Sequence, residues 1–178
     1  MMGFRTKRAI VALVLATGGA ALSAAAGAAP APAAVTACTW GGTPLAPTGS
    51  LTVSPGTTNT PATQPLDFRA TGQLAGGGPC TGTMTFEGVL DTGSSCFTQV
   101  FEGRVRGLPG VVRFWGPGAF GVVDELLYDS AGNVVGSDQP QVLTNATGEG
   151  DPLFLDCGTP EGFTEGNFSS TVELYGNA

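Results

Sequence analysis

Hydrophobic and polar residues alternate in two neighbouring stretches of the chain, 83–90 (TMTFEGVL) and 98–105 (TQVFEGRV), which are near copies of each other. Alternation at period two is typical of a β-strand with one buried face. Between the copies lies Thr-Gly-Ser-Ser at 92–95, where Gly suits the first central position of a type II′ turn. The pattern therefore predicts a β-hairpin in which Phe86 lies opposite Phe101.

A third alternating stretch follows the hairpin after a short Gly-Leu-Pro-Gly sequence. A four-residue loop over 107–110 places Arg104 opposite Arg113 on the outward face of the predicted sheet. In the same register Trp115 lies opposite Glu102. These three strands are expected to form one antiparallel sheet.

Four predicted strands share an inward aromatic residue that is followed two positions later by a small residue. One of these strands precedes the hairpin, over 66–74. The pairs are Phe68/Ala70, Phe86/Gly88, Phe101/Gly103 and Phe114/Gly116. Gly inside a strand is costly unless the sheet bends sharply, as the coiled strands of a barrel do.

The rest of the chain contains shorter apolar runs separated by turn residues. Further strands are expected at 50–53, 122–128, 134–135, 140–143, 153–157 and 168–175. No amphipathic helical pattern follows residue 34, and the 29 Gly and 13 Pro favour many turns. The predicted fold class is all-β, a single antiparallel β-barrel of about eight short strands, with a β-sandwich as the alternative.

The N-terminal segment has the pattern of a secretory signal peptide. Arg5, Lys7 and Arg8 precede a short apolar run and an Ala-rich tract. The run is too short to cross a bilayer, so we expect secretion and no membrane span. The expected organisation is a signal peptide over 1–33, then a Gly/Pro/Thr-rich segment with one short strand. The Gly/Pro/Thr-rich segment is expected to cover 34–65, and the barrel domain that follows it is expected to cover 66–178.

The sequence Val-Thr-Ala-Cys ending at Cys38 resembles the lipobox of bacterial lipoproteins. That resemblance implies an alternative location, in which the protein is anchored by a lipid on Cys38.

The four cysteines are expected to form two disulfides, because export delivers the chain to an oxidising compartment. The hairpin places Cys80 and Cys96 at opposite ends, roughly 30 Å apart, which excludes a bridge between them. Two pairings remain. The one with shorter loops joins Cys38 to Cys80 and Cys96 to Cys157, and it is the one we favour.

Composition excludes most catalytic chemistry in the expected mature chain. After residue 33 the sequence has no Lys or His, and four Arg stand against 14 acidic residues. A Ser-His-Asp triad, a Schiff-base lysine and a histidine-containing zinc site are therefore impossible. We expect no metal and no cofactor. The strong negative charge also argues against nucleic acid as a partner.

Two carboxylate candidates remain. The sequence VLDTGSS around Asp91 resembles the active-site loop of pepsin-like and retropepsin-like aspartic proteases. The resemblance implies that Asp91 is catalytic in a homodimer, because the chain has no second Asp-Thr-Gly, although the same residues also suit a tight turn. Asp124 and Glu125 are adjacent, so on a strand they point to opposite faces, and both are expected in a solvated edge or loop.

Two binding surfaces are predicted. Arg104, Arg106, Arg113 and Trp115 form an exposed arginine patch that is suited to an anionic ligand or an acidic partner protein. The second surface lies inside the barrel, where aromatic side chains either fill the interior or line a site for a small apolar ligand, as in lipocalin-like barrels. Its residues are Phe68, Phe86, Phe101 and Phe114, with Gln99 as the polar group.

An Ala-rich signal, an acidic Gly/Thr-rich body and cysteines without catalytic partners make the chain similar to small exported β-proteins of unassigned function from high-GC Gram-positive bacteria. That resemblance implies no activity. The sequence predicts a secreted, non-enzymatic binding or interaction module. The alternatives are the homodimeric aspartic protease that uses Asp91 and a structural cell-surface protein.

Overall fold

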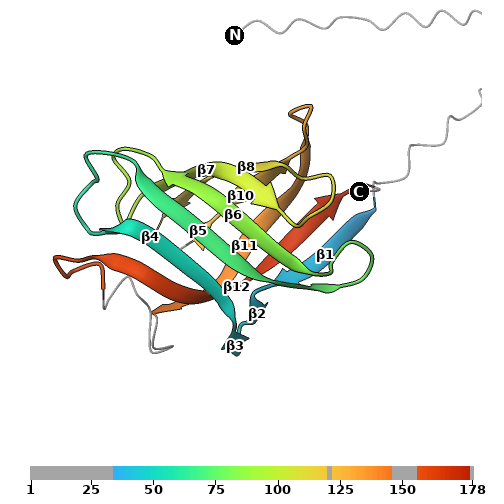
Figure 1. Cartoon of the computed structure of the whole chain (residues 1–178), viewed down its shortest axis with the longest axis horizontal. Helices are drawn as coiled ribbons and strands as arrows, with labels where there is room; N and C mark the ends of the chain where they lie inside the picture. The colour runs from blue at the N-terminus through green and yellow to red at the C-terminus, as the bar shows by residue number, and fades with distance from the viewer. Residues whose placement is uncertain (1–33, 120–121, 146–155, 177–178) are drawn as a thin grey trace, which may run out of the picture. The chain divides into compact units, whose positions relative to one another are not determined.

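The computed structural model describes residues 34–119, 122–145 and 156–176, and every regular element within them is a β-strand (Figure 1). None of these residues forms a helix capable of crossing a membrane. The strands are β1 (Val35–Trp40), β2 (Gly42–Thr43), β3 (Ala46–Pro47), β4 (Gly49–Thr57), β5 (Leu66–Gly76), β6 (Thr83–Leu90), β7 (Gln99–Arg106), β8 (Arg113–Ala119), β9 (Val122–Val123), β10 (Glu125–Tyr128), β11 (Val134–Asn145) and β12 (Phe163–Tyr175). The predicted signal peptide, and most of the strand expected at 153–157, lie outside the described residues.

Eight of the strands close into an antiparallel barrel. The pairing runs through β4, β5, β6, β7, β8, β10, β11 and β12. The last of these then pairs with the first, with Phe168 opposite Gly49. The structure confirms the all-β prediction and its barrel form. Figure 1 shows the strands wrapping around a common axis.

Strands β1 and β4 both pair with β5 on one side and with β12 on the other, at different positions along these two strands. Strand β1 pairs with the C-terminal part of β12, where Cys38 faces Val172, and β4 pairs with the N-terminal part. The small β2–β3 hairpin separates them. The expectation of one short strand in 34–65 was wrong. This segment contains β4, which is one of the eight barrel strands, and β1, an extra strand that pairs with β5 and β12, so the barrel begins before residue 66.

The β6–β7 hairpin forms as predicted, but its register is different. Phe86 lies opposite Val105, and Leu90 lies opposite Phe101, so the predicted Phe86–Phe101 pairing was wrong. The connection is longer than a two-residue turn, because Ser95 forms its own bridge with Thr98. The shift is an even number of residues, so the inward face is unchanged and alternation cannot detect the error.

The β7–β8 register is confirmed, with Arg104 opposite Arg113 and Glu102 opposite Trp115. Glycine at these strand positions lets neighbouring backbones approach closely. Gly88 lies opposite Gly103, and a Cβ on Gly88 would collide with the carbonyl oxygen of Glu102. A side chain at Gly88 would therefore force the two strands apart.

Strand β11 joins two stretches that were expected to be separate strands, 134–135 and 140–143. Its register against β12 shifts between Pro140 and Val142, which marks a bulge. Proline cannot donate to a ladder and is commonly found at such irregularities. The expected strand at 122–128 is instead divided between β9 and β10.

Both disulfides join the cysteines favoured by loop length, Cys38 with Cys80 and Cys96 with Cys157. The first ties β1 to the β5–β6 loop, and the second ties the β6–β7 loop to the segment before β12. Disulfides fit an oxidising compartment. With its sulfur in a disulfide, Cys38 has no thiol left for lipid attachment.

Aromatic side chains fill part of the barrel interior. Phe86 stacks on Phe114 with ring centroids 4.4 Å apart, and Trp40 packs edge-on against Phe168 at 4.5 Å. The Trp40 indole N–H is shared between the carbonyl oxygens of Gly72 and Met84, at 3.2 Å each. Trp40, Phe86 and Phe168 of this cluster also line an open part of the interior.

Candidate functional site

The open part of the interior is a cavity of about 70 Å³, here called the lumen cavity. At ~10–15 Å³ of such space per molecule, it has room for roughly five waters. Most of its wall is apolar. Among the residues that line it are Leu51, Val53, Phe68, Phe101, Leu143 and Phe163.

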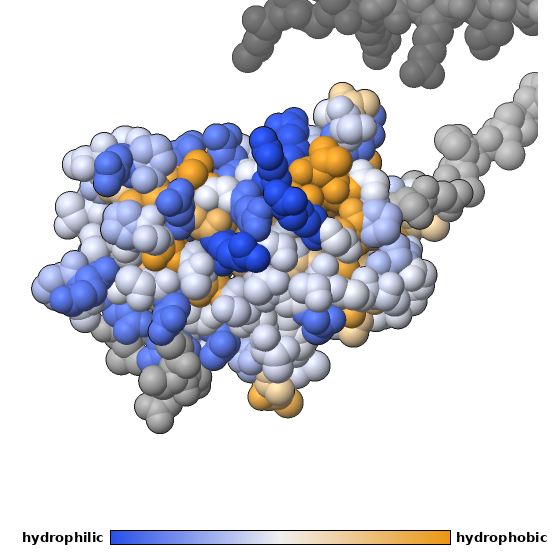
Figure 2. Space-filling model, in the orientation of Figure 1, coloured by the Kyte–Doolittle hydropathy of each residue, from blue (hydrophilic) through white to orange (hydrophobic). Residues whose placement is uncertain are grey.

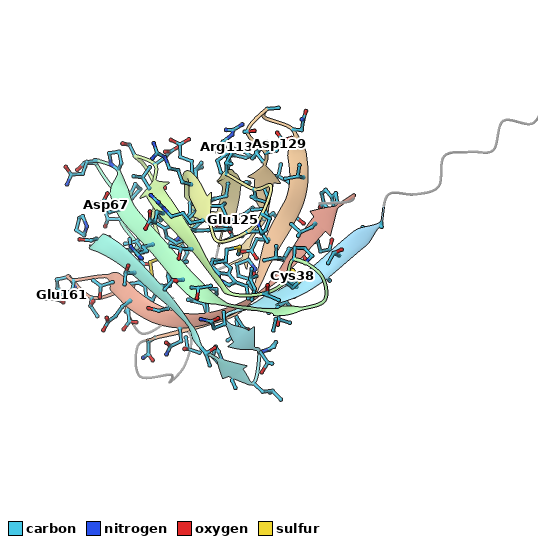
Figure 3. The ribbon with its side chains drawn as sticks, turned by 45° about the vertical axis from the view of Figure 1, so that its right-hand side comes forward. Cys38, Asp67, Arg113, Glu125, Asp129 and Glu161 are labelled. Carbon is cyan, nitrogen blue, oxygen red and sulfur yellow. A yellow bond between two sulfur atoms is a disulfide. The ribbon has the colours of Figure 1, made fainter. Side chains whose placement is uncertain are left out.

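One side of the lumen cavity is acidic. Glu125 of β10 and Asp138 of β11 are direct cross-strand partners, and both side chains line the cavity. They are only 4% and 1% exposed. Figure 3 shows Glu125 inside the barrel, away from the rim where Arg113 and Asp129 lie. We call Glu125 and Asp138 the acid pair.

Strand alternation directs both carboxyl groups inward. Glu125 and Leu127 are the buried positions of β10, and Gly136 and Asp138 are buried in β11. The connecting turn holds this alignment, because Asp129 accepts hydrogen bonds from the backbone amides at 131 and 133. Bonds to Asn133 are also the main reason that the pKa of Asp129 is lowered.

Few donors reach the acid pair. The hydroxyl of Ser170, on β12, donates to Oδ1 of Asp138. Oδ2 of Asp138 has no partner unless Glu125 carries a proton and donates it. No described arginine is nearby to compensate, since all four of them have exposed side chains.

Burial controls the protonation of the acid pair. Desolvation raises the pKa of Glu125 well above its ordinary value, and the neighbouring charge of Asp138 raises it further. Desolvation also raises the pKa of Asp138 to about 6. Hydrogen bonds to Asp138, of which the one from Ser170 has the largest effect, lower its pKa and so limit this rise. At neutral pH the pair therefore holds one proton and about one negative charge.

The acid pair was not predicted from the sequence. Asp124 is exposed as expected, but the expectation that Glu125 is solvated was wrong. The rule that adjacent residues face opposite sides was correct, and the partner of Glu125 comes from the next strand instead. Interpreting 134–143 as one strand would have placed Asp138 on an inward face, which is the signal that was overlooked.

Four of the five predicted interior residues line the lumen cavity: Phe68, Phe86, Gln99 and Phe101. The fifth, Phe114, is buried in the aromatic cluster and does not line the cavity. The interior is therefore partly filled and partly open.

The arginine patch lies on the outer face of the barrel. Arg106 is paired with Glu87 at 3.0 Å, and Glu87 also binds Arg69 at 2.9 Å. The guanidinium of Arg113 lies over the Tyr128 ring, 4.2 Å from its centroid. Arg104 has no ion pair with a described residue. Figure 2 shows strongly hydrophilic residues crossing the face it draws, with hydrophobic areas on either side.

The remaining patch residue, Trp115, is 39% exposed and lies beside the arginines in the sheet. The structure thus keeps the four patch residues on neighbouring strands, β7 and β8.

Asp91 begins the β6–β7 loop. Its amide donates to the Val100 carbonyl, and its own carbonyl accepts from the Ser94 amide. Asp91 is not among the residues that line the lumen cavity. The Asp-Thr-Gly-Ser sequence is thus part of a turn, and the protease interpretation of Asp91 stays a prediction.

Comparison of the chain with models of protein families, with curated proteins and with solved structures found no match. The fold and the site define a class by themselves: a disulfide-bonded, closed antiparallel β-barrel with an acid pair in its lumen. Because a barrel supports many functions, any proposal must rest on the site.

Proposed function

We propose that this protein is a secreted, non-enzymatic binding protein that takes a small, largely apolar ligand into the lumen cavity. The observation that carries the proposal is the acid pair on the wall of an apolar cavity. An unfilled cavity destabilises a barrel, and a buried negative charge without a cation beside it is costly. A ligand that fills the space and contacts the pair offsets both costs.

The size of the cavity limits the ligand. Room for roughly five waters corresponds to a molecule of about six to ten non-hydrogen atoms. Small ligands gain about 0.3–1.5 kcal/mol per atom. Eight atoms at about 0.8 kcal/mol each give a Kd in the range of tens of micromolar.

Native mass spectrometry of protein purified from its own producer tests the proposal, together with calorimetric titration of small apolar compounds. A Leu143→Trp variant fills the cavity and is expected to abolish binding. The matched control is Val142→Trp, the neighbouring position, which does not line the cavity. Equal binding by both variants, or no binding by the unaltered protein, would overturn the proposal.

An acidic partner protein at the arginine patch is a second candidate function. It is favoured because Arg104 faces Arg113 without an ion pair to a described residue, and like charges in register are unfavourable without an anion. The double change Arg104→Gln and Arg113→Gln is expected to lose partners in pull-down experiments. Arg69→Gln serves as the control, and a stability gain with unchanged partners would reject this candidate.

A further inference from the structure

The negative charge of the acid pair has no cationic partner among the described residues. The sequence has no Lys or His after residue 8, and its four later arginines are all exposed. A negative charge in an apolar interior is stabilised by donors or by a cation, and here Ser170 is the one side chain seen to donate to Asp138. The proton held by Glu125 is the other donor within the pair, so the pair keeps one negative charge that no buried cation in the described part of the chain neutralises.

The acid pair is the only source of charge among the described residues that line the lumen cavity. Among the described residues that line the lumen cavity, Glu125 and Asp138 alone have titratable side chains, because Cys96 and Cys157 are joined in a disulfide. The other polar lining side chains are neutral, namely Thr57 and Gln99, with the indole of Trp40. The lumen therefore has a single anionic spot on an apolar wall.

Resting on the proposed function, we infer that the ligand of the lumen cavity carries one cationic amine, which pairs with Glu125 and Asp138. An ammonium group has three donors, so it can hydrogen-bond to oxygens of both carboxyl groups and neutralises the single charge of the pair. The hydrocarbon part of the ligand then packs against Phe68, Phe101 and other apolar residues of the wall. The ligand class is a primary alkyl or arylalkyl amine of about six to ten non-hydrogen atoms.

This inference implies a particular pH dependence. Asp138, with a pKa of about 6, must be ionised to attract the amine. Below that pH its protonation weakens binding by about tenfold per pH unit, whereas an alkyl amine stays charged up to about pH 10. Affinity should therefore fall as the pH drops below 6.

The test compares three probes of equal length, hexylamine, 1-hexanol and hexanoate, by calorimetric titration at pH 7.5. The amine is expected to bind at least about tenfold more tightly than the alcohol, and hexanoate to bind least. Equal affinity for amine and alcohol would refute the amine while leaving the proposed function intact. Failure of all three probes to bind at millimolar concentration would refute both.

Variants distinguish amine binding by the buried acid pair from binding by an exposed carboxylate. Asp138→Asn should remove the preference for the amine while keeping binding of hexanol, and Asp124→Asn, an exposed neighbour, should change neither. Glu125→Gln keeps the charge of Asp138 and replaces the protonated carboxyl by another hydrogen-bond donor, so the preference for the amine at pH 7.5 should be retained. Loss of the amine preference in Glu125→Gln, or its retention in Asp138→Asn, would refute the inference.

Discussion

Glu125 on β10 lies directly opposite Asp138 on β11, with both side chains in the barrel interior. Opposed carboxyl groups repel each other, and burial removes the water that would screen them. The pair stays compatible with the fold because one carboxyl holds a proton and the Ser170 hydroxyl donates to the other. This relationship makes the stability of the protein depend on pH.

Stability should fall as the pH rises from 4 to 7. The folded-state pKa of Asp138, about 6, is above its unfolded value near 3.9, so the folded state binds the proton more tightly. Its contribution is complete below pH 4 and is lost as the pH rises through 6, and the change is about 3 kcal/mol. Urea denaturation between pH 4 and 8 measures this. Asp138→Asn should make the decline shallower, because Glu125 alone of the pair then titrates with a raised pKa, whereas Asp124→Asn should leave the profile unchanged. A rise in stability over this range would contradict the assignment.

Replacement of Trp40 by Phe should destabilise the protein by roughly 2–3 kcal/mol. The change removes an indole N–H shared by two carbonyl oxygens and leaves space in the aromatic cluster. Trp115→Phe, at an exposed position, is the control and should change the free energy of unfolding by less than about 0.5 kcal/mol. Similar effects at the two sites would argue against the position of β1 in the barrel.

The two disulfides should differ in their effect on binding and not in their effect on stability. They join residues 42 and 61 positions apart, and on the chain-entropy model each contributes about 4 kcal/mol. Only Cys96 and Cys157 line the lumen cavity. Replacing that pair by Ser should weaken ligand binding, whereas replacing Cys38 and Cys80 should not. Calorimetry of the two double variants measures both effects.

Gly88 in β6 and Gly77 in the β5–β6 loop allow a matched comparison of the effect of an added methyl group on stability. Gly88→Ala should cost more than about 2 kcal/mol, because the added Cβ meets the Glu102 carbonyl in the coiled sheet. Gly77→Ala lies in open space without a left-handed backbone conformation and should change stability by less than about 1 kcal/mol. Thermal unfolding of the two variants provides the measurement, and equal stability would contradict the close β6–β7 contact.

Local pattern was sufficient for part of the architecture. Alternation identified β5, β6, β7 and β8, because a half-buried strand must place apolar side chains at every second position. The four-residue β7–β8 loop also set a register that the structure confirms. Loop-length reasoning selected the correct disulfides.

Other elements could not be predicted in this way. The β6–β7 register was wrong because any even shift preserves the inward face, and the interactions that select one register lie in an eight-residue loop. Strand β1 was missed because its alternation is short and its partners, β5 and β12, are distant in the chain. Its buried Trp40 makes sense only once the barrel is closed.

The acid pair illustrates what the sequence alone can decide and what requires the tertiary structure. The sequence alone decides that Glu125 and Asp124 point to opposite faces, since that follows from the geometry of a single strand. Which of the two faces is the interior, and which residue of β11 lies opposite, depends on barrel closure and on a register that shifts between Leu127 and Tyr128. Pairing between strands is a long-range property, so the chemistry of the lumen was decided by the tertiary structure.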